Sequence, residues 1–395
     1  MLSLALFTSN PDTGYIVEQI AQEAGQFDLV IKGEPVPPSG ELFQSLNRLD
    51  PEVILLDLAD WHNPELVSND RLDMAGIARY IQASDLRAVV IGFRRSWSRL
   101  EQADFEASGV LELLHEPFSA LDLEKAAYNA LHRTHPVTNQ NILAFLPAKA
   151  GSGCSVATLN TAAALANKLQ QKVLLLEADR RSGAFAIMLN LERQRGLPQA
   201  LKNASSMSDL KWPEHYAEVH RMHVLLAEPG QRGMLAGWSD YYQLLRFVQE
   251  KYDFIFADLP EVVNEASAEL VRCARGVFVI CTPEVPSLHM ALLRIAELKE
   301  FGVAKDRVHV LLNRQERGGL SRQDIENVLG RPLFATLPND YSHVRDAIVQ
   351  SRLVAPGSAF GEGCQELALK VSGLAAPSRL ETTFGLLSKL RKRAS

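Results

Sequence analysis

The chain has 395 residues, of which 47% are apolar and 22% charged, and this composition predicts a soluble globular protein with room for two or three domains. Its formal net charge is −6, which excludes a general attraction to nucleic acid, so no nucleic-acid partner is expected. The four cysteines form no CxxC pair and no zinc spacing, which favours a reducing cytoplasm.

The first residues predict a strand rather than an export signal. The stretch 1–7 has no basic start, and its apolar run is too short for a signal peptide. No segment approaches the ~20 apolar residues that cross a bilayer. We therefore expect a cytoplasmic protein.

Apolar runs alternate with helical patterns along nearly the whole chain, which predicts parallel sheets with helices on both faces. We expect five βα units in the first half. The first helix is predicted to begin at Asn10-Pro11-Asp12 and to end before Gly25, and the last one covers Leu121–Leu131. The predicted strands are Leu4–Phe7, Phe27–Ile31, Val53–Leu58, Ala88–Phe93 and Val110–Leu114.

A second set of strands follows a polar segment that contains Pro136, and we place a linker at 136–140. The predicted fold class is therefore α/β with two doubly wound domains, at 1–135 and 141–378, and a basic tail at 379–395. The predicted strands of the second domain are Asn141–Leu146, Val173–Leu176, Val224–Ala227, Phe254–Asp258, Val277–Cys281, Val308–Asn313 and Leu333–Leu337.

The first strand of the second domain runs into a glycine-rich loop, residues 147–155, which is followed by a helical pattern from Val156 to Leu169. Loop N–H groups and a helix N-terminus present positive dipole to a phosphate, and glycines allow a close approach. The Ser155 hydroxyl stands where it would bind Mg²⁺. The pattern predicts a phosphate cradle, and a glycine-rich turn without a ligand is the alternative.

This loop resembles the deviant Walker A motif of the ParA/MinD superfamily, K-G-G-x-G-K-[ST]. Ala150 replaces a glycine, and Cys154 stands in place of the loop lysine, which predicts weaker affinity and slow or absent hydrolysis. Lys149 matches the family's signature lysine, which is implied to reach the partner's nucleotide across a homodimer. The resemblance implies that ATP and Mg²⁺ bind here, with contacts from Lys149, Gly151, Ser152, Gly153, Cys154, Ser155 and Val156.

Carboxylates end two of the predicted strands. Glu177 and Asp179 follow one strand, and alternation places both on one side of its end. They resemble the family's D-x-D segment, which implies that Glu177 lies near the metal and Asp179 near the attacking water. Asp258 resembles the Walker B aspartate, which is implied to hold Mg²⁺ through water. Surface carboxylates at strand ends are the alternative for each.

Two later segments resemble the family's adenine pocket. Asn313-Arg314 ends a strand, and its asparagine is implied to hydrogen-bond the base. Pro338-Asn339 belongs to a segment like the I-P-x-D turn that flanks the base. An ordinary turn and helix cap is the alternative, because Asn and Asp are good capping residues.

The first half resembles a response-regulator receiver domain. Asp57 matches the phospho-acceptor position. The other parts of the phosphate switch are missing: Thr8-Ser9-Asn10 replaces the acidic pair, Phe93-Arg94 the Ser/Thr, and Glu116 the lysine before Pro117. We expect Asp57 to be silent and the domain to serve docking or dimerisation. An α/β domain of another lineage is the alternative.

The order of the two halves resembles the TadZ/CpaE family of pilus assembly proteins. Besides the loop, the resemblance is strongest at 177–192 and at 258–265. It implies a dimeric scaffold that positions the proteins assembling Flp-type (tight adherence) pili or a related secretion apparatus, at the cell pole or at the inner face of the membrane. Two other hypotheses stay open: an active MinD/ParA-type positioning ATPase, and a nucleotide-free interaction scaffold.

The last stretch, residues 380–393, has apolar residues at helical spacing and a basic end. This pattern is typical of a short amphipathic helix that binds a membrane surface. A helix packed on the body, or a disordered tail, is the alternative.

Overall fold

The structure is a computed structural model, which divides into two compact units, Met1–Val137 and Thr138–Ser395. The described residues are 1–34, 36–68, 70–137, 141–180, 182–191, 196–228, 236–316 and 318–373. The predicted tail at 379–395 lies outside them, as does most of the predicted linker. Among the described helices, none combines the length and the apolar character that crossing a membrane requires.

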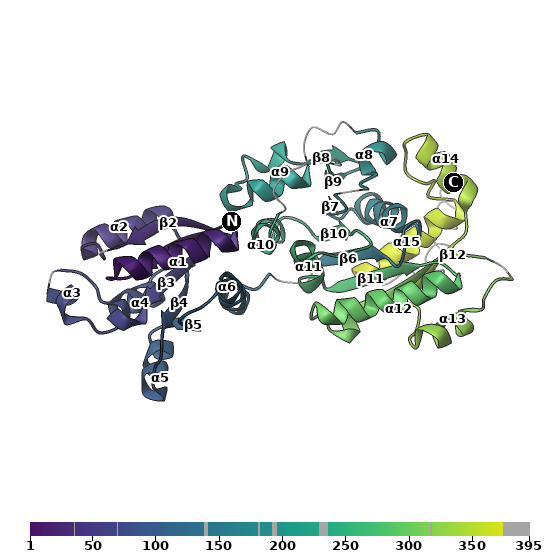
Figure 1. The fold of residues 1–395 in the computed structure, drawn as a ribbon. Coiled ribbons are helices and arrows are strands. Elements are labelled where there is room, and N and C mark those ends of the chain that lie inside the picture. Colours follow the sequence, from purple (N-terminus) through teal and green to yellow (C-terminus); the bar gives the residue numbers. More distant parts are fainter. Residues whose placement is uncertain are drawn as a thin grey trace, which may run out of the picture. The chain divides into compact units, whose positions relative to one another are not determined.

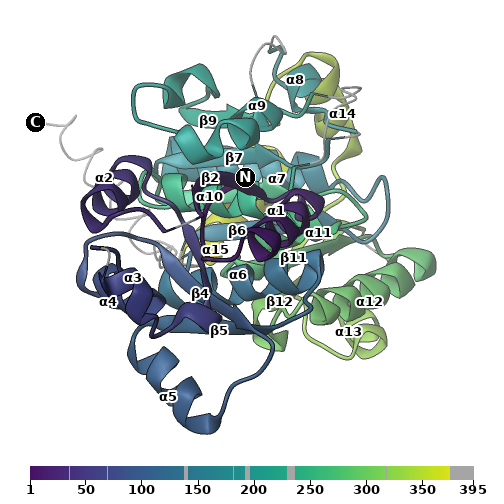
Figure 2. The same ribbon diagram turned by 60° about the vertical axis from the view of Figure 1, so that its left-hand side comes forward.

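The first unit is a parallel sheet of five strands with helices around it. The strands are β1 (Leu2–Phe7), β2 (Phe27–Gly33), β3 (Val53–Asp57), β4 (Val89–Arg94) and β5 (Val110–His115). The helices are α1 (Pro11–Ala24), α2 (Ser39–Leu49), the 3-10 turn η1 (Leu58–Asp60), α3 (Pro64–Ser68), α4 (Met74–Ala83), α5 (Arg99–Ala107) and α6 (Ala120–Thr134). The strand order, β2-β1-β3-β4-β5, is that of flavodoxin-like doubly wound sheets. In Figure 2, α5 projects below β5.

The first helix shows how local sequence sets these boundaries. The Asn10 side chain accepts hydrogen bonds from the N–H groups of Asp12 and Thr13, and Pro11 begins the helix. Gly25 ends it in the left-handed conformation, with φ 66°. Both predicted ends of this helix are confirmed.

The second unit is an eight-stranded sheet, drawn in Figure 1. Its strands are β6 (Ile142–Pro147), β7 (Val173–Glu177), β8 (Ala217–Val219), β9 (Met222–Leu225), β10 (Phe254–Asp258), β11 (Gly276–Cys281), β12 (Val308–Gln315) and β13 (Ala335–Pro338). Their order is β13-β12-β11-β6-β10-β7-β9-β8. Only the edge pair β8–β9 is antiparallel among the described strands.

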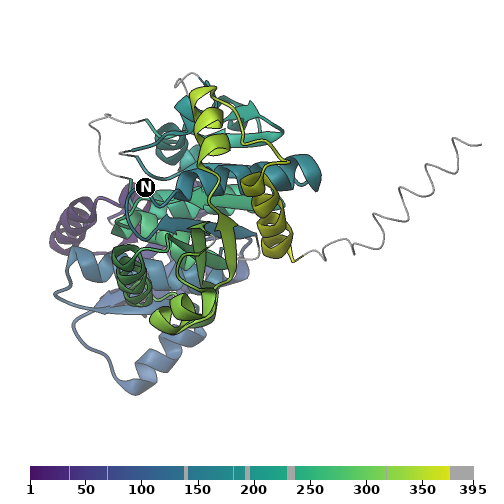
Figure 3. The same ribbon diagram turned by 90° about the vertical axis from the view of Figure 1, so that its right-hand side faces the viewer.

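Helices cover both faces of this sheet, as Figure 1 shows. They are α7 (Cys154–Lys168), α8 (Phe185–Met188), α9 (Leu197–Lys202), α10 (Trp238–Val248), α11 (Glu265–Arg272), α12 (Val285–Glu300), α13 (Arg322–Leu329), α14 (Tyr341–Val349) and α15 (Ala359–Ser372), with 3-10 turns η2 (Ala204–Ser206), η3 (Trp212–Glu214) and η4 (Lys305–Arg307). Helices α7 and α15 pack together, and α15, in yellow, lies on the outer side of the unit in Figure 3.

The core of the second unit centres on β6. The Phe145 ring stacks on Phe256 of β10, with centroids 5.3 Å apart, and on Phe278 of β11, at 4.8 Å. This packing fixes β6 between its two neighbours, so the loops after β6, β10 and β7 leave from adjacent carboxyl ends. In open α/β sheets this edge is where ligands bind.

The predicted α/β fold of the second half, with a parallel sheet, is confirmed. Strand β8 was not predicted, because three partly exposed residues give no periodic signal. Strand β13 begins at Ala335 rather than at Leu333, and β3 ends at Asp57, where η1 starts. Apart from the added strand β8, these differences only shift the boundaries of predicted strands.

Candidate functional site

The loop between β6 and α7 depends on two glycines with positive φ. Gly151 has φ 81° and Gly153 has φ 83°, a conformation that side-chain-bearing residues rarely adopt. Gly153 is also tightly enclosed, because a Cβ atom added there would lie 2.4 Å from the Asn313 side-chain nitrogen. Gly153 directly precedes α7, so these backbone angles set the direction in which the helix N-terminus points.

The end of β12 braces this loop. The Asn313 side-chain Nδ2 donates to the Ser152 carbonyl at 2.8 Å, and its Oδ1 accepts from the Arg314 N–H at 2.9 Å. The Arg314 guanidinium donates to the Gly151 carbonyl at 2.9 Å. Asn313 was predicted to contact a base; in the structure its amide holds the loop.

Two carboxylates contact the start of the loop. The Ala150 N–H donates to Glu261 Oε2 at 2.9 Å, and Lys149 Nζ lies 3.0 Å from Glu284 Oε2. Neither glutamate was predicted as part of the site. Glu261 comes three positions after Asp258. The sequence alone does not show that a carboxylate at this position contacts the loop after β6, because that contact depends on how the two strands lie in the sheet.

Asp258 lies at the centre of the strand ends. It pairs in register with Glu177 on the neighbouring strand, and it is only 2% exposed. None of the described residues forms a hydrogen bond with its buried Oδ1 atom. Burial, with the smaller effect of the Glu177 and Asp179 charges, raises the pKa of this carboxyl to about 7, although a hydrogen bond with Ser155 opposes the shift.

This arrangement fits a divalent cation. A buried carboxylate oxygen without a partner, next to a serine hydroxyl, offers the hard oxygen ligands that Mg²⁺ takes. Asp258 and Ser155 are therefore the residues that would hold the metal, and a cation there would offset the cost of burying the carboxylate.

Replacing Asp258 with asparagine is expected to stabilise the metal-free protein at pH 8. The folded-state pKa, about 7, lies above 3.8, the ordinary pKa of an aspartate, so the folded state binds the proton more tightly. The stabilisation by that proton is complete below about pH 4 and is lost as pH rises through 7. Asparagine does not ionise, so D258N removes the cost of burying an ionised carboxylate. We expect its free energy of unfolding to exceed that of the wild type by on the order of 2–4 kcal/mol at pH 8 and to differ little at pH 4.

Thermal unfolding in EDTA at pH 4.5 and pH 8 measures this difference. The control is Asp306→Asn, which changes an exposed carboxylate of the same unit. A wild-type protein and a D258N variant with the same dependence of Tm on pH would contradict the prediction.

The predicted base-binding residues gather in one pocket. The cavity has a volume of about 260 Å³ and lies between the loop, the end of β12 and α14. Residues predicted from the sequence that line it are Gly153, Val156, Asn313, Arg314, Pro338 and Asn339. Asp340, the last residue of the predicted base-flanking turn, also lines it, and residues that the sequence did not predict are Tyr341, Val344, Arg345, Ile348, Val349 and Phe360. Most of the lining residues that were not predicted belong to α14. The helical spacing of apolar residues after Asp340 could have indicated that a helix lines the pocket there.

Comparison with known proteins gives a consistent result for this unit. No family model matches the chain. The septum site-determining protein MinD of Thermotoga maritima is 25% identical over 260 residues, which are 63% of this chain and 93% of the relative. An uncharacterized ATP-binding protein of Methanocaldococcus jannaschii is 24% identical over 245 residues, covering 60% and 90%.

Solved structures share the fold. A ParA family ATPase from Chlorobium tepidum superposes with a TM-score of 0.54 at 19% identity, covering 58% of this chain and 99% of that one. The cell division ATPase MinD of Pyrococcus furiosus gives 0.51 at 20% identity, covering 60% and 100%. The second unit is homologous to the MinD/ParA-family ATPases. The glycine loop, the strand-end carboxylates and the pocket all belong to this MinD/ParA-like unit.

Cys154 is the largest departure from the MinD/ParA loop. Its side chain is 5% exposed at the first position of α7, with Sγ 3.9 Å from Thr158 Oγ1. Burial raises the pKa of this thiol well above its usual value, and the nearby Asp258 charge raises it further. A neutral thiol therefore occupies the position at which the motif places a lysine.

Glu177 braces the backbone of this unit. Its Oε1 accepts from the Phe185 N–H at 2.6 Å, and its Oε2 accepts from the Ala227 N–H at 2.8 Å. Burial raises the pKa of its carboxyl. Asp179 Oδ1 accepts from the Ser182 N–H at 3.0 Å. These contacts favour Ser155 and Asp258 over Glu177 as the residues that meet the metal.

Asp57, in the first unit, is buried, and each of its two carboxylate oxygens accepts a hydrogen bond. Its Oδ2 accepts from the Thr8 hydroxyl at 2.8 Å and its Oδ1 from the Ala59 N–H at 3.0 Å. Burial raises its pKa. Burial raises the pKa of the Glu116 carboxyl, and the nearby Asp57 charge raises it further. A carboxylate thus lies near Asp57 at the position where the receiver pattern has a lysine.

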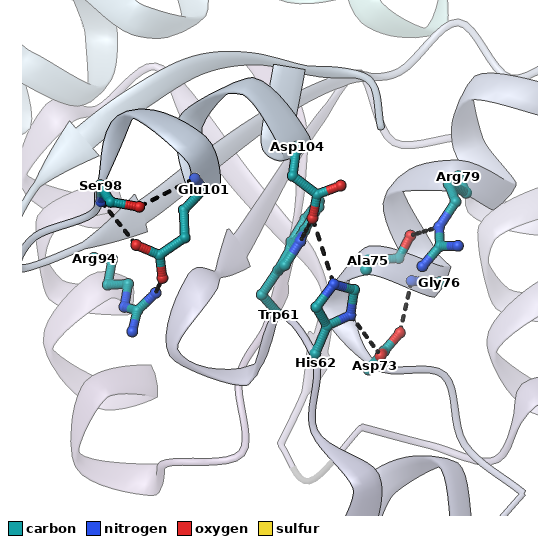
Figure 4. Close-up of polar contacts among 10 residues, drawn as sticks. All are labelled: Trp61, His62, Asp73, Ala75, Gly76, Arg79, Arg94, Ser98, Glu101 and Asp104. Carbon is teal, nitrogen blue, oxygen red and sulfur yellow. Dashed lines mark hydrogen bonds and ion pairs between the residues drawn. The ribbon is translucent and has the colours of Figure 1, made fainter. Parts of the chain in front are cut away.

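The segment after Asp57 is held by side-chain contacts, drawn in Figure 4. The Trp61 indole N–H donates to Asp104 Oδ2 at 2.7 Å. His62 lies between two carboxylates, 3.6 Å from Asp73 and 3.4 Å from Asp104. Asp104 belongs to α5, so this segment ties α5 to the end of β3.

Proposed function

We propose that the chain is an ATP-binding, dimerising scaffold that positions the assembly of Flp-type pili or a related secretion apparatus, with slow or absent ATP hydrolysis. The observation that carries the nucleotide part is the single pocket in which Gly153, Val156, Asn313, Arg314, Pro338 and Asn339 meet. Convergence of residues from three separate segments is what a binding site requires and a chance turn does not.

ATP would bind with its base in this pocket and its phosphates on the loop. The N-terminus of α7 and the loop N–H groups face the phosphates, and Ser155 and Asp258 hold the Mg²⁺. Support comes also from the relative whose name describes an ATP-binding protein, which this chain matches over 90% of its length.

Slow hydrolysis follows from the charge of the loop. In phosphoryl transfer, a loop lysine stabilises the charge that develops on the phosphates. Cys154 is neutral and buried, so it contributes no such stabilisation. Bound ATP would then act mainly to hold two copies together.

Dimerisation would use the face around Lys149. The Lys149 side chain is 36% exposed, and its partner Glu284 is 53% exposed, so the ion pair is free to exchange across an interface. Val262 and Val285, next to the two loop-contacting glutamates, are 67% and 73% exposed. Exposed apolar side chains beside an exchangeable ion pair are what a nucleotide-dependent interface needs.

The pilus assignment rests on the order of the two units. A flavodoxin-like sheet precedes the MinD/ParA-like unit, as in the TadZ/CpaE resemblance, and we propose that it is a receiver-like domain. Its Asp57 has both oxygens occupied, so the domain would act by docking and not by phosphorylation. In cells, loss of the chain is expected to abolish surface pili, and a fluorescent fusion is expected to mark the assembly site.

Calorimetry of the full chain tests the nucleotide part. We expect saturable binding of MgATP, phosphate release close to the protein-free background, and a dimer on size-exclusion chromatography only with MgATP. Lys149→Ala is expected to keep ATP binding within a few-fold and to abolish the dimer, because its side chain would act on the partner's nucleotide. Lys168→Ala, a change on the same unit away from the loop, is the control. Absence of heat on MgATP titration would refute the proposal, and steady phosphate release lost in K149A would favour the active ATPase.

A further inference from the structure

The nucleotide region is acidic. Glu177, Asp179 and Asp258 lie at the strand ends, and Glu261 contacts the loop at the Ala150 N–H. Cys154 has no cationic form, so it adds no positive charge. Triphosphate is itself strongly anionic, so binding there needs positive charge, and the loop itself contains only that of Lys149.

Lys149 lies within the loop, and the Arg314 side chain reaches the loop from β12. Lys149 is already paired with Glu284 at 3.0 Å. Among the described residues, the Arg314 guanidinium has no carboxylate partner, and its one hydrogen bond is to the Gly151 carbonyl at 2.9 Å. A guanidinium has five N–H donors, so most of its donors stay available.

The backbone of Arg314 is held in an uncommon conformation. Its φ is 59°, a left-handed value that costs about 1–2 kcal/mol for a residue with a side chain. The Asn313 Oδ1 atom accepts from the Arg314 N–H at 2.9 Å and stabilises this turn. This backbone conformation directs the Arg314 side chain from the end of β12 toward the glycine loop. Arg314 also lines the pocket proposed for the base.

We propose that Arg314 supplies the phosphate-binding charge that Cys154 does not, by donating hydrogen bonds to the phosphates of the bound adenine nucleotide. This assignment rests on the proposed nucleotide site and goes beyond it, because the sequence resemblance placed Arg314 with the base. The guanidinium reaches the loop from β12, whereas the usual lysine reaches the phosphates from within the loop. Guanidinium–phosphate pairs are charge-assisted and bidentate, so one side chain can serve two oxygens.

A series of ligands with increasing phosphate number tests this role. Binding of adenosine, AMP, ADP and ATP, each with Mg²⁺, is measured by calorimetry for the full-length wild type, Arg314→Ala and Arg314→Lys. In R314A we expect ATP affinity to fall about 10- to 100-fold and adenosine affinity to change less than about 3-fold. R314K, which keeps the charge and loses the bidentate geometry, is expected to lie between.

Arg345 provides the matched control. It lines the same pocket, but its guanidinium is paired with the Asp346 carboxylate at 3.0 Å. Arg345→Ala is expected to change all four affinities by the same small factor. Lysine at position 154 provides the rescue: in the double variant R314A/C154K, ATP affinity is expected to recover toward that of C154K alone, while adenosine affinity is unchanged.

The outcomes separate the two levels of the proposal. If R314A loses adenosine and ATP affinity by equal factors, Arg314 acts on the base or on the loop, and the phosphate role is overturned. If R314A binds all four ligands like the wild type, the role is also overturned. If the wild type binds none of them, the proposed nucleotide site itself fails. Should R314A fail to fold, R314K and the salt dependence of wild-type ATP binding give the same decision, because a phosphate contact weakens with salt.

Discussion

Replacing Cys154 with lysine is expected to tighten MgATP binding about 10- to 100-fold. The thiol lies at the first position of α7, beside Asp258, in the acidic end of the sheet. A lysine there would point its ammonium at both the Asp258 carboxylate and the phosphates, and it would lower the Asp258 pKa from its present value of about 7. Calorimetric titration of MgATP into the two proteins measures the change directly.

The same substitution is expected to raise phosphate release, since the developing charge on the phosphates would be neutralised. Cys154→Ser is the control, because it changes the thiol to a hydroxyl of similar size without adding charge. A buried lysine costs stability when no partner reaches it, so Tm is measured with and without MgATP. Equal ATP affinity in C154K and C154S, with both proteins folded, would show that charge at this position does not limit binding.

Replacing Gly153 with alanine is expected to destabilise the second unit and to abolish nucleotide binding. The new Cβ atom would meet the Asn313 side-chain nitrogen at 2.4 Å, so the amide must leave the Ser152 carbonyl that it now holds. Together with the cost of a left-handed alanine, the loss of this buried bond amounts to about 2–4 kcal/mol. Chemical denaturation gives the free energy of unfolding, and calorimetry gives the affinity.

Gly151 provides a matched comparison for this prediction. Its φ is 81°, nearly the same as at Gly153, but no atom lies within 4 Å of an added Cβ. Gly151→Ala should therefore carry only the conformational cost, about 1 kcal/mol. The difference in the free energy of unfolding between the two variants measures the effect of the contact between the new Cβ atom and Asn313. Adding Asn313→Ala to G153A should recover part of the lost free energy of unfolding. Equal destabilisation by G151A and G153A would show that the contact with Asn313 is unimportant.

Much of the second unit was predictable because its signals are local. Apolar runs mark the central strands, since a parallel strand covered on both faces is apolar throughout, as β10 is. The loop glycines and the carboxylates at strand ends also follow from position alone. Short or partly exposed elements gave no such signal: β8 has only three residues, and α14 exposes Tyr341 and Val349 at its surface.

The contacts of the site depended on the tertiary structure. Glu177 was predicted near a metal, yet both its oxygens accept backbone N–H groups from segments that the sequence could not place beside it. Glu261 and Glu284 reach the loop for the same reason, across neighbouring strands. Side-chain partners between distant segments depend on register and twist, which local pattern does not encode.

The sequence by itself determined that a strand, a glycine loop and a helix follow one another, that the loop has Cys154 where a lysine is usual, and that carboxylates end the neighbouring strands. These are properties of neighbouring residues, so they are fixed before folding. Only folding sets which atoms meet. The Asn313 amide donates to the Ser152 carbonyl, and the Arg314 guanidinium donates to the Gly151 carbonyl. Folding also buries an Asp258 oxygen that has no hydrogen-bond partner among the described residues. Packing of β6, β10 and β12 in one sheet is what brings these distant residues within bonding distance.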